Sequence, residues 1–210
     1  MTSTAKQKLN SLKDIPTICI FGPAGSGKGT QARVLSSYSN IFHLSTGDLF
    51  RSMPKNHPFF ALCSSYTSRG ALVPDEEVMK LVANYIQGKI DTFAFDPSCD
   101  LLLLDGLPRN SNQAKILLDY VDLQATIELK ITSIEELTQR LLQRAQQQGR
   151  LDDASETAIR NRLKIYSEET TQALDLMKET CPLNISVNGS MPCASVSAQV
   201  LNPLSSILRP

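Results

Sequence analysis

The chain has 210 residues, 41% of them apolar, with 21 basic and 21 acidic side chains. The balanced charge creates no net field that would attract nucleic acid or an anionic membrane, so we expect neither as a partner. Five scattered cysteines without a C-x-x-C pair argue against a zinc site and favour a reducing compartment. Because no stretch is long and apolar enough for a membrane helix, we expect a cytoplasmic protein.

Short apolar runs alternate with helical patterns along the chain. Strands are predicted at residues 17–22, 41–45, 100–105, 125–131 and 183–187. Helices are predicted at 29–38, 75–88, 111–119, 133–147, 155–180 and 193–207. This alternation predicts an α/β fold, a five-stranded parallel sheet with helices on both faces. The polar residues 1–14 are expected to form a flexible tail before a single domain at 15–210.

The first predicted strand runs directly into a glycine-rich turn that opens a helix, Gly22-Pro23-Ala24-Gly25-Ser26-Gly27-Lys28-Gly29-Thr30. Glycines let successive backbone N–H groups face inward, and the helix N-terminus adds the positive end of its dipole. Lys28 can then reach the β- and γ-phosphates of a nucleoside triphosphate, and Thr30 a phosphate or magnesium ion. A glycine-rich turn without a ligand is the alternative, but the flanking strand and helix favour a phosphate loop. The residues expected to bind this phosphate chain are Gly25, Ser26, Gly27, Lys28, Gly29 and Thr30.

Two segments interrupt the alternation of strands and helices. Residues 45–74 contain short helical pieces separated by Pro54, Pro58 and Pro74, and residues 144–153 are polar and flanked by arginines. Ligands in open parallel sheets bind beyond the carboxyl ends of the strands. Both segments are therefore expected to be flaps over that edge, belonging to the same domain.

Further motifs follow the glycine-rich turn in order, namely Ser45-Thr46-Gly47-Asp48-Leu49-Phe50-Arg51, Gly70-Ala71-Leu72-Val73-Pro74-Asp75, Leu104-Asp105-Gly106-Leu107-Pro108-Arg109 and Gly149-Arg150-Leu151-Asp152-Asp153. Together they resemble the adenylate kinases and related nucleoside monophosphate kinases, from about residue 16 to residue 205. The resemblance implies a monomeric P-loop kinase that transfers a phosphoryl group from ATP to AMP with Mg²⁺, giving two ADP. Residues 45–74 would be its flap for the monophosphate. The brief 144–153 stretch resembles the short-lid form without structural zinc.

The resemblance assigns phosphate-binding roles to a ring of cations. Such a transfer needs positioning and charge neutralisation, which guanidinium groups supply to two oxygens at a time. Arg51 and Arg109 would hold the acceptor phosphate, and Asp105 the water shell of magnesium. The catalytic set would be Lys28, Asp105, Arg109, Arg140, Arg144, Arg150 and Arg162, with Arg140 and Arg144 also expected to bind ATP.

Some of these assignments have alternatives. Arg140 and Arg144 could simply line a solvated helix face. Arg162 lies one residue beyond the usual spacing from Asp152, so Arg160 is the fallback. Asp152 or Asp153 would pair with arginines of the lid or, alternatively, cap the following helix. No role is assigned to His43 or His57.

Two positions bear on the acceptor base. Thr46 and Gln113 stand where adenylate kinases usually have a hydroxyl residue and glutamine, whereas pyrimidine kinases tend to have alanine and asparagine. An amide donates and accepts at once, which matches the N1 and N6 edge of adenine. The residues expected to bind AMP are Thr46, Arg51, Ala71, Leu72, Val73, Gly106, Leu107, Pro108, Arg109, Gln113, Arg150 and Arg162. Met191 would touch the donor adenine. The alternatives are a UMP/CMP kinase and a nucleotide-binding sensor without turnover.

Overall fold

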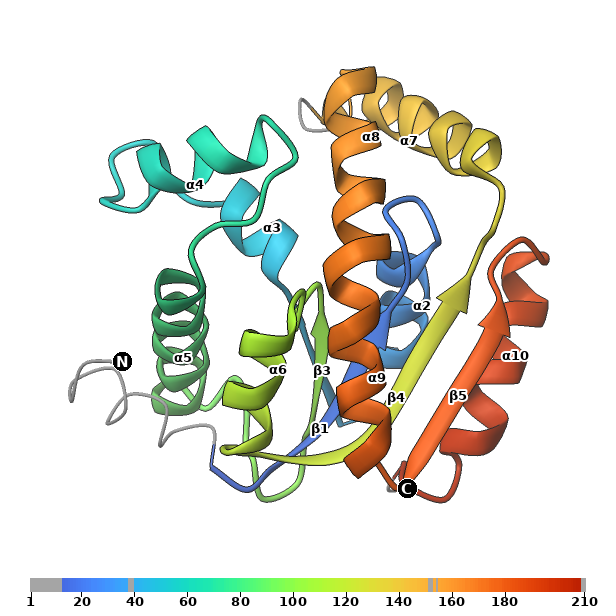
Figure 1. Cartoon of the computed structure of the whole chain (residues 1–210). Helices are drawn as coiled ribbons and strands as arrows, with labels where there is room; N and C mark the ends of the chain where they lie inside the picture. The colour runs from blue at the N-terminus through green and yellow to red at the C-terminus, as the bar shows by residue number, and fades with distance from the viewer. Residues whose placement is uncertain (1–12, 38–39, 151–152, 154, 209–210) are drawn as a thin grey trace.

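A five-stranded parallel sheet forms the centre of the molecule. The computed structural model describes residues 13–37, 40–150, 153 and 155–208. The strands are β1 (Ile15–Phe21), β2 (Ile41–Ser45), β3 (Leu101–Asp105), β4 (Val121–Lys130) and β5 (Leu183–Asn188). Their order is β2-β3-β1-β4-β5, and every neighbouring pair is parallel (Figure 1). The predicted α/β fold is confirmed.

Helices cover both faces of this sheet. One face packs against α5 (Asp75–Asp91), α6 (Ser111–Leu118) and α9 (Thr171–Thr180), and the other against α2 (Lys28–Ser36) and α10 (Cys193–Leu204) (Figure 1). Alternate residues of β1 serve the two cores: Cys19 joins the first, and Ile18 the second. Because β3 is covered on both sides, its continuous run of leucines is entirely buried.

Three consecutive helical segments form one long helical rod (Figure 1). It consists of α8 (Glu156–Ile165), a π-helical turn (Tyr166–Thr170) and α9, and it matches the helix predicted at 155–180. The Ser155 hydroxyl accepts a hydrogen bond from the Ala158 N–H and thereby caps the start of α8. Capping is therefore not the role of Asp153. The rod follows α7 (Ile134–Gln148), which contains the first residues of the predicted lid.

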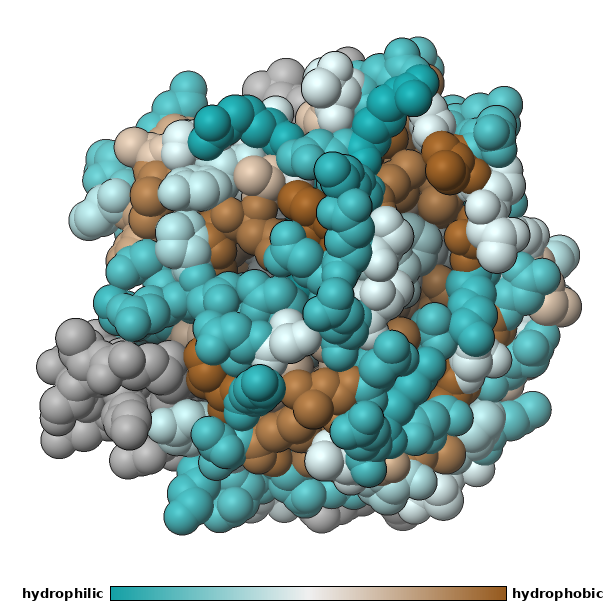
Figure 2. All heavy atoms as spheres, viewed as in Figure 1, coloured by the Kyte–Doolittle hydropathy of each residue, from teal (hydrophilic) through white to brown (hydrophobic). Residues whose placement is uncertain are grey.

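The predicted flap contains two short helices, α3 (Thr46–Arg51) and α4 (Phe60–Thr67), with the prolines between and after them. Phe59, Phe60 and Tyr66 are partly buried against the first core. Figure 2 shows hydrophobic residues at the surface over this region, with hydrophilic residues around them. The flap and lid boundaries remain predictions. Most of the predicted tail, residues 1–12, lies outside the described part of the chain.

All five cysteines are free. In the described residues, no helix has the length and hydropathy needed to cross a membrane.

Candidate active site

Three predicted motifs meet at the carboxyl edge of the sheet. The glycine-rich turn follows β1, the flap follows β2, and Gly106 follows β3. Asp105 lies in register with Ile20 on one side and with Ser45 on the other. The strand register therefore brings the loop after β1, the start of the flap and Asp105 side by side, as expected for a ligand site in an open α/β sheet.

The phosphate loop wraps around its own lysine. The Lys28 ammonium donates hydrogen bonds to the carbonyl oxygens of Gly22 at 2.6 Å and Pro23 at 2.9 Å. Gly22 has φ +147°, and a Cβ there would lie 2.5 Å from the Ser26 Oγ, so no other residue fits. The Ser26 Oγ is buried and has no hydrogen-bond partner among the described residues. An orphaned hydroxyl within a curled backbone suits a bound phosphate oxygen.

Burial and, to a smaller extent, nearby charges shift the pKa of Lys28. Burial lowers the pKa of Lys28 from 10.5 to about 8; Asp105 opposes this shift, and Arg109, Arg162 and Arg144 add to it. A phosphate chain in the loop would favour the ammonium form and reverse the shift. A bound anion would therefore stabilise the charged form of Lys28 in the loop.

Asp105 is a buried carboxylate beside the start of α2. Burial alone would raise its pKa, but the imidazole of His43 and the charge of Lys28 hold it below the usual value. The His43 Nε2 lies 3.7 Å from the Asp105 Oδ2, and a Cβ on Gly29 would lie 3.6 Å from the same oxygen. An ionised carboxylate facing a phosphate loop is a hard oxygen donor, which suits the water shell of magnesium. The described residues contain no cluster of three or more acidic, cysteine or histidine groups that could hold a metal on its own.

Asp153 forms ion pairs with two of the predicted catalytic arginines, Arg144 and Arg162. Its carboxylate is 0% exposed; Oδ2 lies 2.6 Å from Arg144 Nη2, and Oδ1 lies 2.5 Å from Arg162 Nη1. Arg160 instead pairs with Glu156, and those two side chains are 76% and 65% exposed. The structure thus turns Arg162 inward and Arg160 outward. Asp152, the other predicted lid acid, lies outside the described residues.

Arg140 joins α7 to the turn after β5. Its guanidinium donates to the Gly189 carbonyl oxygen at 3.1 Å and lies 2.7 Å from Glu136, whose carboxylate also accepts from the Ser190 hydroxyl at 2.7 Å. A Cβ on Gly189 would lie 3.0 Å from the Ser26 carbonyl oxygen, so this turn borders the phosphate loop. Met191 is exposed on the same turn. Arg140 and Met191, two of the three predicted donor contacts outside the loop, therefore lie next to it.

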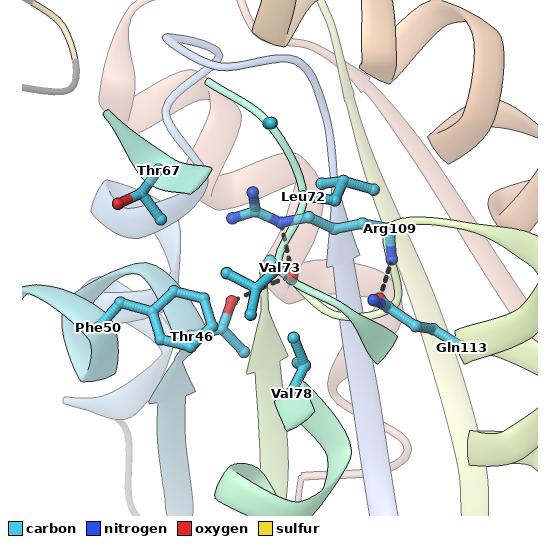
Figure 3. A pocket seen from close by; sticks show the side chains of 10 residues that line it. Thr46, Phe50, Thr67, Leu72, Val73, Val78, Arg109 and Gln113 are labelled. Carbon is cyan, nitrogen blue, oxygen red and sulfur yellow. Dashed lines mark hydrogen bonds between the residues drawn. The ribbon is translucent and has the colours of Figure 1, made fainter. Parts of the chain in front are cut away.

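A pocket opens between the flap, the end of β3 and the start of α6 (Figure 3). Its lining residues are Thr46, Phe50, Thr67, Ala71, Leu72, Val73, Val78, Gly106, Arg109 and Gln113. Most of the residues expected to bind AMP are among them, and Phe50, Thr67 and Val78 are additions. Leu107 instead packs in the first hydrophobic core.

The floor of this pocket depends on Gly106. It has φ +85°, and a Cβ would lie 2.7 Å from the Thr46 Oγ1 and 3.0 Å from the Arg109 Nη2. Its carbonyl oxygen accepts from the Thr46 hydroxyl at 3.1 Å and from the Arg109 Nε at 2.8 Å. Gly106 therefore holds the Thr46 hydroxyl and the Arg109 guanidinium together from two segments of the chain. Glycine is required because these groups approach its backbone closely.

Arg51 and Arg150 share the carboxylate of Asp48. The Asp48 Oδ1 lies 2.5 Å from the Arg51 Nη2 and 3.7 Å from the Arg150 Nη2. Burial would raise the pKa of Asp48, but its hydrogen bond and ion pair with Arg51 and the charge of Arg150 hold it below the usual value. Asp48 thereby links Arg51 of the predicted flap to Arg150 of the predicted lid.

The flap also touches α8 directly. Gly70 has φ +68°, and a Cβ there would lie 2.5 Å from the Ala158 carbonyl oxygen. The Asn161 side chain donates to the Arg69 carbonyl oxygen at 2.9 Å. These contacts hold the end of the flap segment against α8.

Sequence reasoning missed the contact of His43 with Asp105, that of Asn161 with Arg69, and that of Asp75, whose carboxylate accepts a hydrogen bond from the Gln113 amide. Strand alternation places His43 on the same side of β2 as Ser45, which was the available signal for a contact near Asp105. Asn161 and Asp75 had no such signal, because they lie on helices that no strand register aligns with their partners.

The comparisons with known proteins agree with this geometry. The family model described as adenylate kinase matches residues 20–181. The chain is 37% identical over 193 residues to an adenylate kinase of Bifidobacterium longum, covering 89% of this chain and 98% of that protein. An adenylate kinase of Cyanothece is 37% identical over 188 residues, with 87% and 92% covered, and one of Flavobacterium psychrophilum is 36% identical over 178 residues, with 82% and 89% covered.

The chain belongs to the adenylate kinase family. This membership confirms the resemblance that the ordered motifs predicted, and it makes the protein a phosphotransferase of the nucleoside monophosphate kinase class. The comparisons do not favour the alternative of a UMP/CMP kinase or of a sensor without turnover.

Proposed function

We propose that this enzyme transfers the γ-phosphoryl group of ATP to AMP, reversibly and with Mg²⁺, giving two ADP. The observation that supports this most is the register of Asp105 with both Ile20 and Ser45. It puts the phosphate loop and the pocket behind Thr46 at one edge of the sheet. Two nucleotides bound there would point their phosphates toward each other.

The reaction itself requires little covalent chemistry from the protein. An oxygen of the acceptor phosphate forms a bond to the γ-phosphorus, while the bond from that phosphorus to the oxygen bridging the β-phosphate breaks. The acceptor is already an anion, so no general base is needed. The task of the protein is to hold several phosphates in line although they repel each other.

The cations of the site suit this task. Lys28 would release the loop carbonyls and bind the β- and γ-phosphates, with the backbone N–H groups of the loop around them. Arg109 would hold the acceptor phosphate from the opposite side. Arg144 and Arg162, oriented by Asp153, would approach the transferred group. Magnesium bound with ATP would neutralise phosphate charge, and Asp105 would hold its water shell.

The pocket of Figure 3 would take the acceptor base. Phe50, Leu72 and Val73 offer apolar walls, and Thr46 and Gln113 offer polar groups. Closure of the flap and lid would keep water from the phosphoryl group.

We further propose that the enzyme acts as a monomer in the cytoplasm and supplies the purine nucleotide pool. One chain provides both the loop and the pocket, which supports a monomer. The five free cysteines suit a reducing compartment.

The experiment that tests this function measures ADP formation from ATP and Mg²⁺ with AMP, CMP, UMP and GMP offered separately. We expect a strong preference for AMP, and loss of turnover on removal of Mg²⁺ with a chelator. A preference for CMP or UMP would overturn the acceptor assignment. ATP binding without turnover on any monophosphate would overturn the kinase proposal in favour of a sensor.

A further inference from the structure

Gln113 lines the acceptor pocket, yet its amide already has two partners inside the protein. The side chain is 2% exposed and starts in the first turn of α6. Its Oε1 accepts a hydrogen bond from the Arg109 backbone N–H at 2.8 Å, the bond drawn in Figure 3. Its Nε2 donates to the Asp75 Oδ1 at 2.7 Å. These two bonds leave one acceptor and one donor of the amide for a ligand, because the oxygen has a second lone pair and the nitrogen has a second hydrogen.

The Asp75 carboxylate accepts hydrogen bonds from the side-chain amides at the start of α6. Its Oδ1 also accepts from the Asn110 Nδ2 at 2.9 Å, and its Oδ2 accepts from the Asn112 Nδ2 at 2.7 Å. Asn110 in turn caps α6, because its Oδ1 accepts from the Gln113 backbone N–H at 2.8 Å. Asp75 is the first residue of α5, so this network joins the end of the flap segment to the helix that carries Gln113.

The two partners of Gln113 fix which way round its amide lies. A backbone N–H can only donate, and a carboxylate offers only acceptors. The Gln113 oxygen must therefore face Arg109, and its nitrogen must face Asp75. Turning the amide over would oppose donor to donor and acceptor to acceptor in a buried site, where unpaired polar groups are costly.

The orientation of this amide decides which base it can read. The free N–H and the free lone pair complement adenine, which has an acceptor at N1 and a donor at the 6-amino group. Hypoxanthine and guanine present the reverse, a donor at N1 and an acceptor at O6. A turned amide in the same place would complement those bases instead.

From this network we propose that Asp75 is a positioning residue that makes the site selective for 6-amino over 6-oxo bases, by preventing the Gln113 amide from turning over. The proposal rests on the proposed function, in which Gln113 faces the acceptor base. Asp75 itself would not touch the substrate and would act only through Gln113. It also extends to pyrimidines, because cytosine shares the adenine pattern at N3 and the 4-amino group, whereas uracil has the reverse.

The test compares kcat/KM for AMP and IMP in the wild type and in Asp75→Asn. Asparagine can present a donor as well as an acceptor to Gln113, so the substitution removes one of the two contacts that oppose a turned amide, and the Arg109 N–H remains as the other. We expect the AMP-to-IMP ratio to fall about tenfold, with KM for ATP unchanged. The CMP-to-UMP ratio should fall in the same direction. A ratio that stays within about twofold of the wild type would overturn the proposal.

A merely structural role would lower all activities together and leave these ratios unchanged. Asp75→Ser, with a small polar residue suited to a helix start, is the second variant if Asp75→Asn does not fold. Glu76→Gln is the matched control, because it removes the neighbouring charge from the same helix start and should leave the ratios as they are.

A double-variant cycle tests whether Asp75 affects base selectivity through Gln113. In a Gln113→Ala background, Asp75→Asn should no longer change the AMP-to-IMP ratio, because the residue through which it acts is gone. An undiminished effect there would overturn the proposal. A wild type that does not phosphorylate AMP would instead refute the proposed function, so the two failures are distinguishable.

Discussion

The phosphate loop takes its shape from consecutive residues, whereas the acceptor pocket is assembled from segments far apart in the chain. Lys28 bonds to the backbone of its own loop. In the pocket, Thr46, Gly106 and Gln113 are held by partners from other segments. The loop therefore offers generic recognition of phosphate through backbone groups and charge. The pocket can select a base because side chains fix one another's orientation. Substitutions should accordingly affect turnover at the loop and selectivity at the pocket.

Lys28→Ala tests the loop half with the largest expected effect. Loss of the ammonium removes the charge that offsets repulsion between phosphates, so we expect turnover to fall by about 10³ or more. The measurement is steady-state ADP formation at saturating ATP and AMP, with the exposed Lys115→Ala on α6 as control. Turnover within about tenfold of the wild type would contradict the assignment of the phosphate loop.

Arg162→Ala and Arg160→Ala form a matched pair two residues apart on α8. Arg162 contacts the buried Asp153, and Arg160 lies at the exposed surface. We expect kcat/KM to fall about 10²-fold for Arg162→Ala and to change less than about twofold for Arg160→Ala. Equal effects in the two variants would show that the inward turn of Arg162 has no part in catalysis.

ATP affinity should depend on pH through Lys28. Its pKa in the free protein is about 8, and bound phosphates favour the ammonium form. ATP should therefore bind most tightly below this value and weaken about tenfold from pH 7 to pH 9, as Lys28 loses its proton. Calorimetric titration of ATP checks this, and Lys28→Met should lose the pH dependence. An unchanged affinity across this range in the wild type would refute it.

The same lysine should affect stability in the opposite direction. The unfolded chain keeps the proton up to about pH 10.5, so burying Lys28 opposes folding at neutral pH. This opposition fades as the pH rises from about 8 to 10.5, because the folded state then no longer holds a buried charge.

Asn161→Ala has the smallest expected effect and tests whether the acceptor pocket can be weakened without affecting the phosphate loop. It removes one hydrogen bond between α8 and the flap. We expect KM for AMP to rise about threefold, since a single neutral hydrogen bond contributes little, and KM for ATP to stay unchanged. Initial rates with each substrate varied in turn provide the measurement, with the exposed Asn202→Ala as control. An equal rise in KM for ATP would contradict the separation of the phosphate loop and the acceptor pocket.

Much of the fold and of the donor half could be predicted from the sequence. The alternation of apolar runs and helical patterns predicted the strands and the parallel sheet, because burial on both faces requires continuous apolar segments such as Leu101–Leu104. The loop from Gly22 to Thr30 was predictable because turn chemistry is local. The π-helical turn at Tyr166–Thr170 was not, because its pattern of hydrophobic residues is that of an ordinary helix.

The sequence by itself determined which chemical groups the site contains and the family to which the chain belongs, since both depend on residue types at short spacings. Only the tertiary structure decided that Arg162, not Arg160, faces Asp153, and that Asp75 holds the Gln113 amide. The orientation of a side chain depends on partners from distant segments. Those partners become neighbours only when the strands align and the helices pack on them.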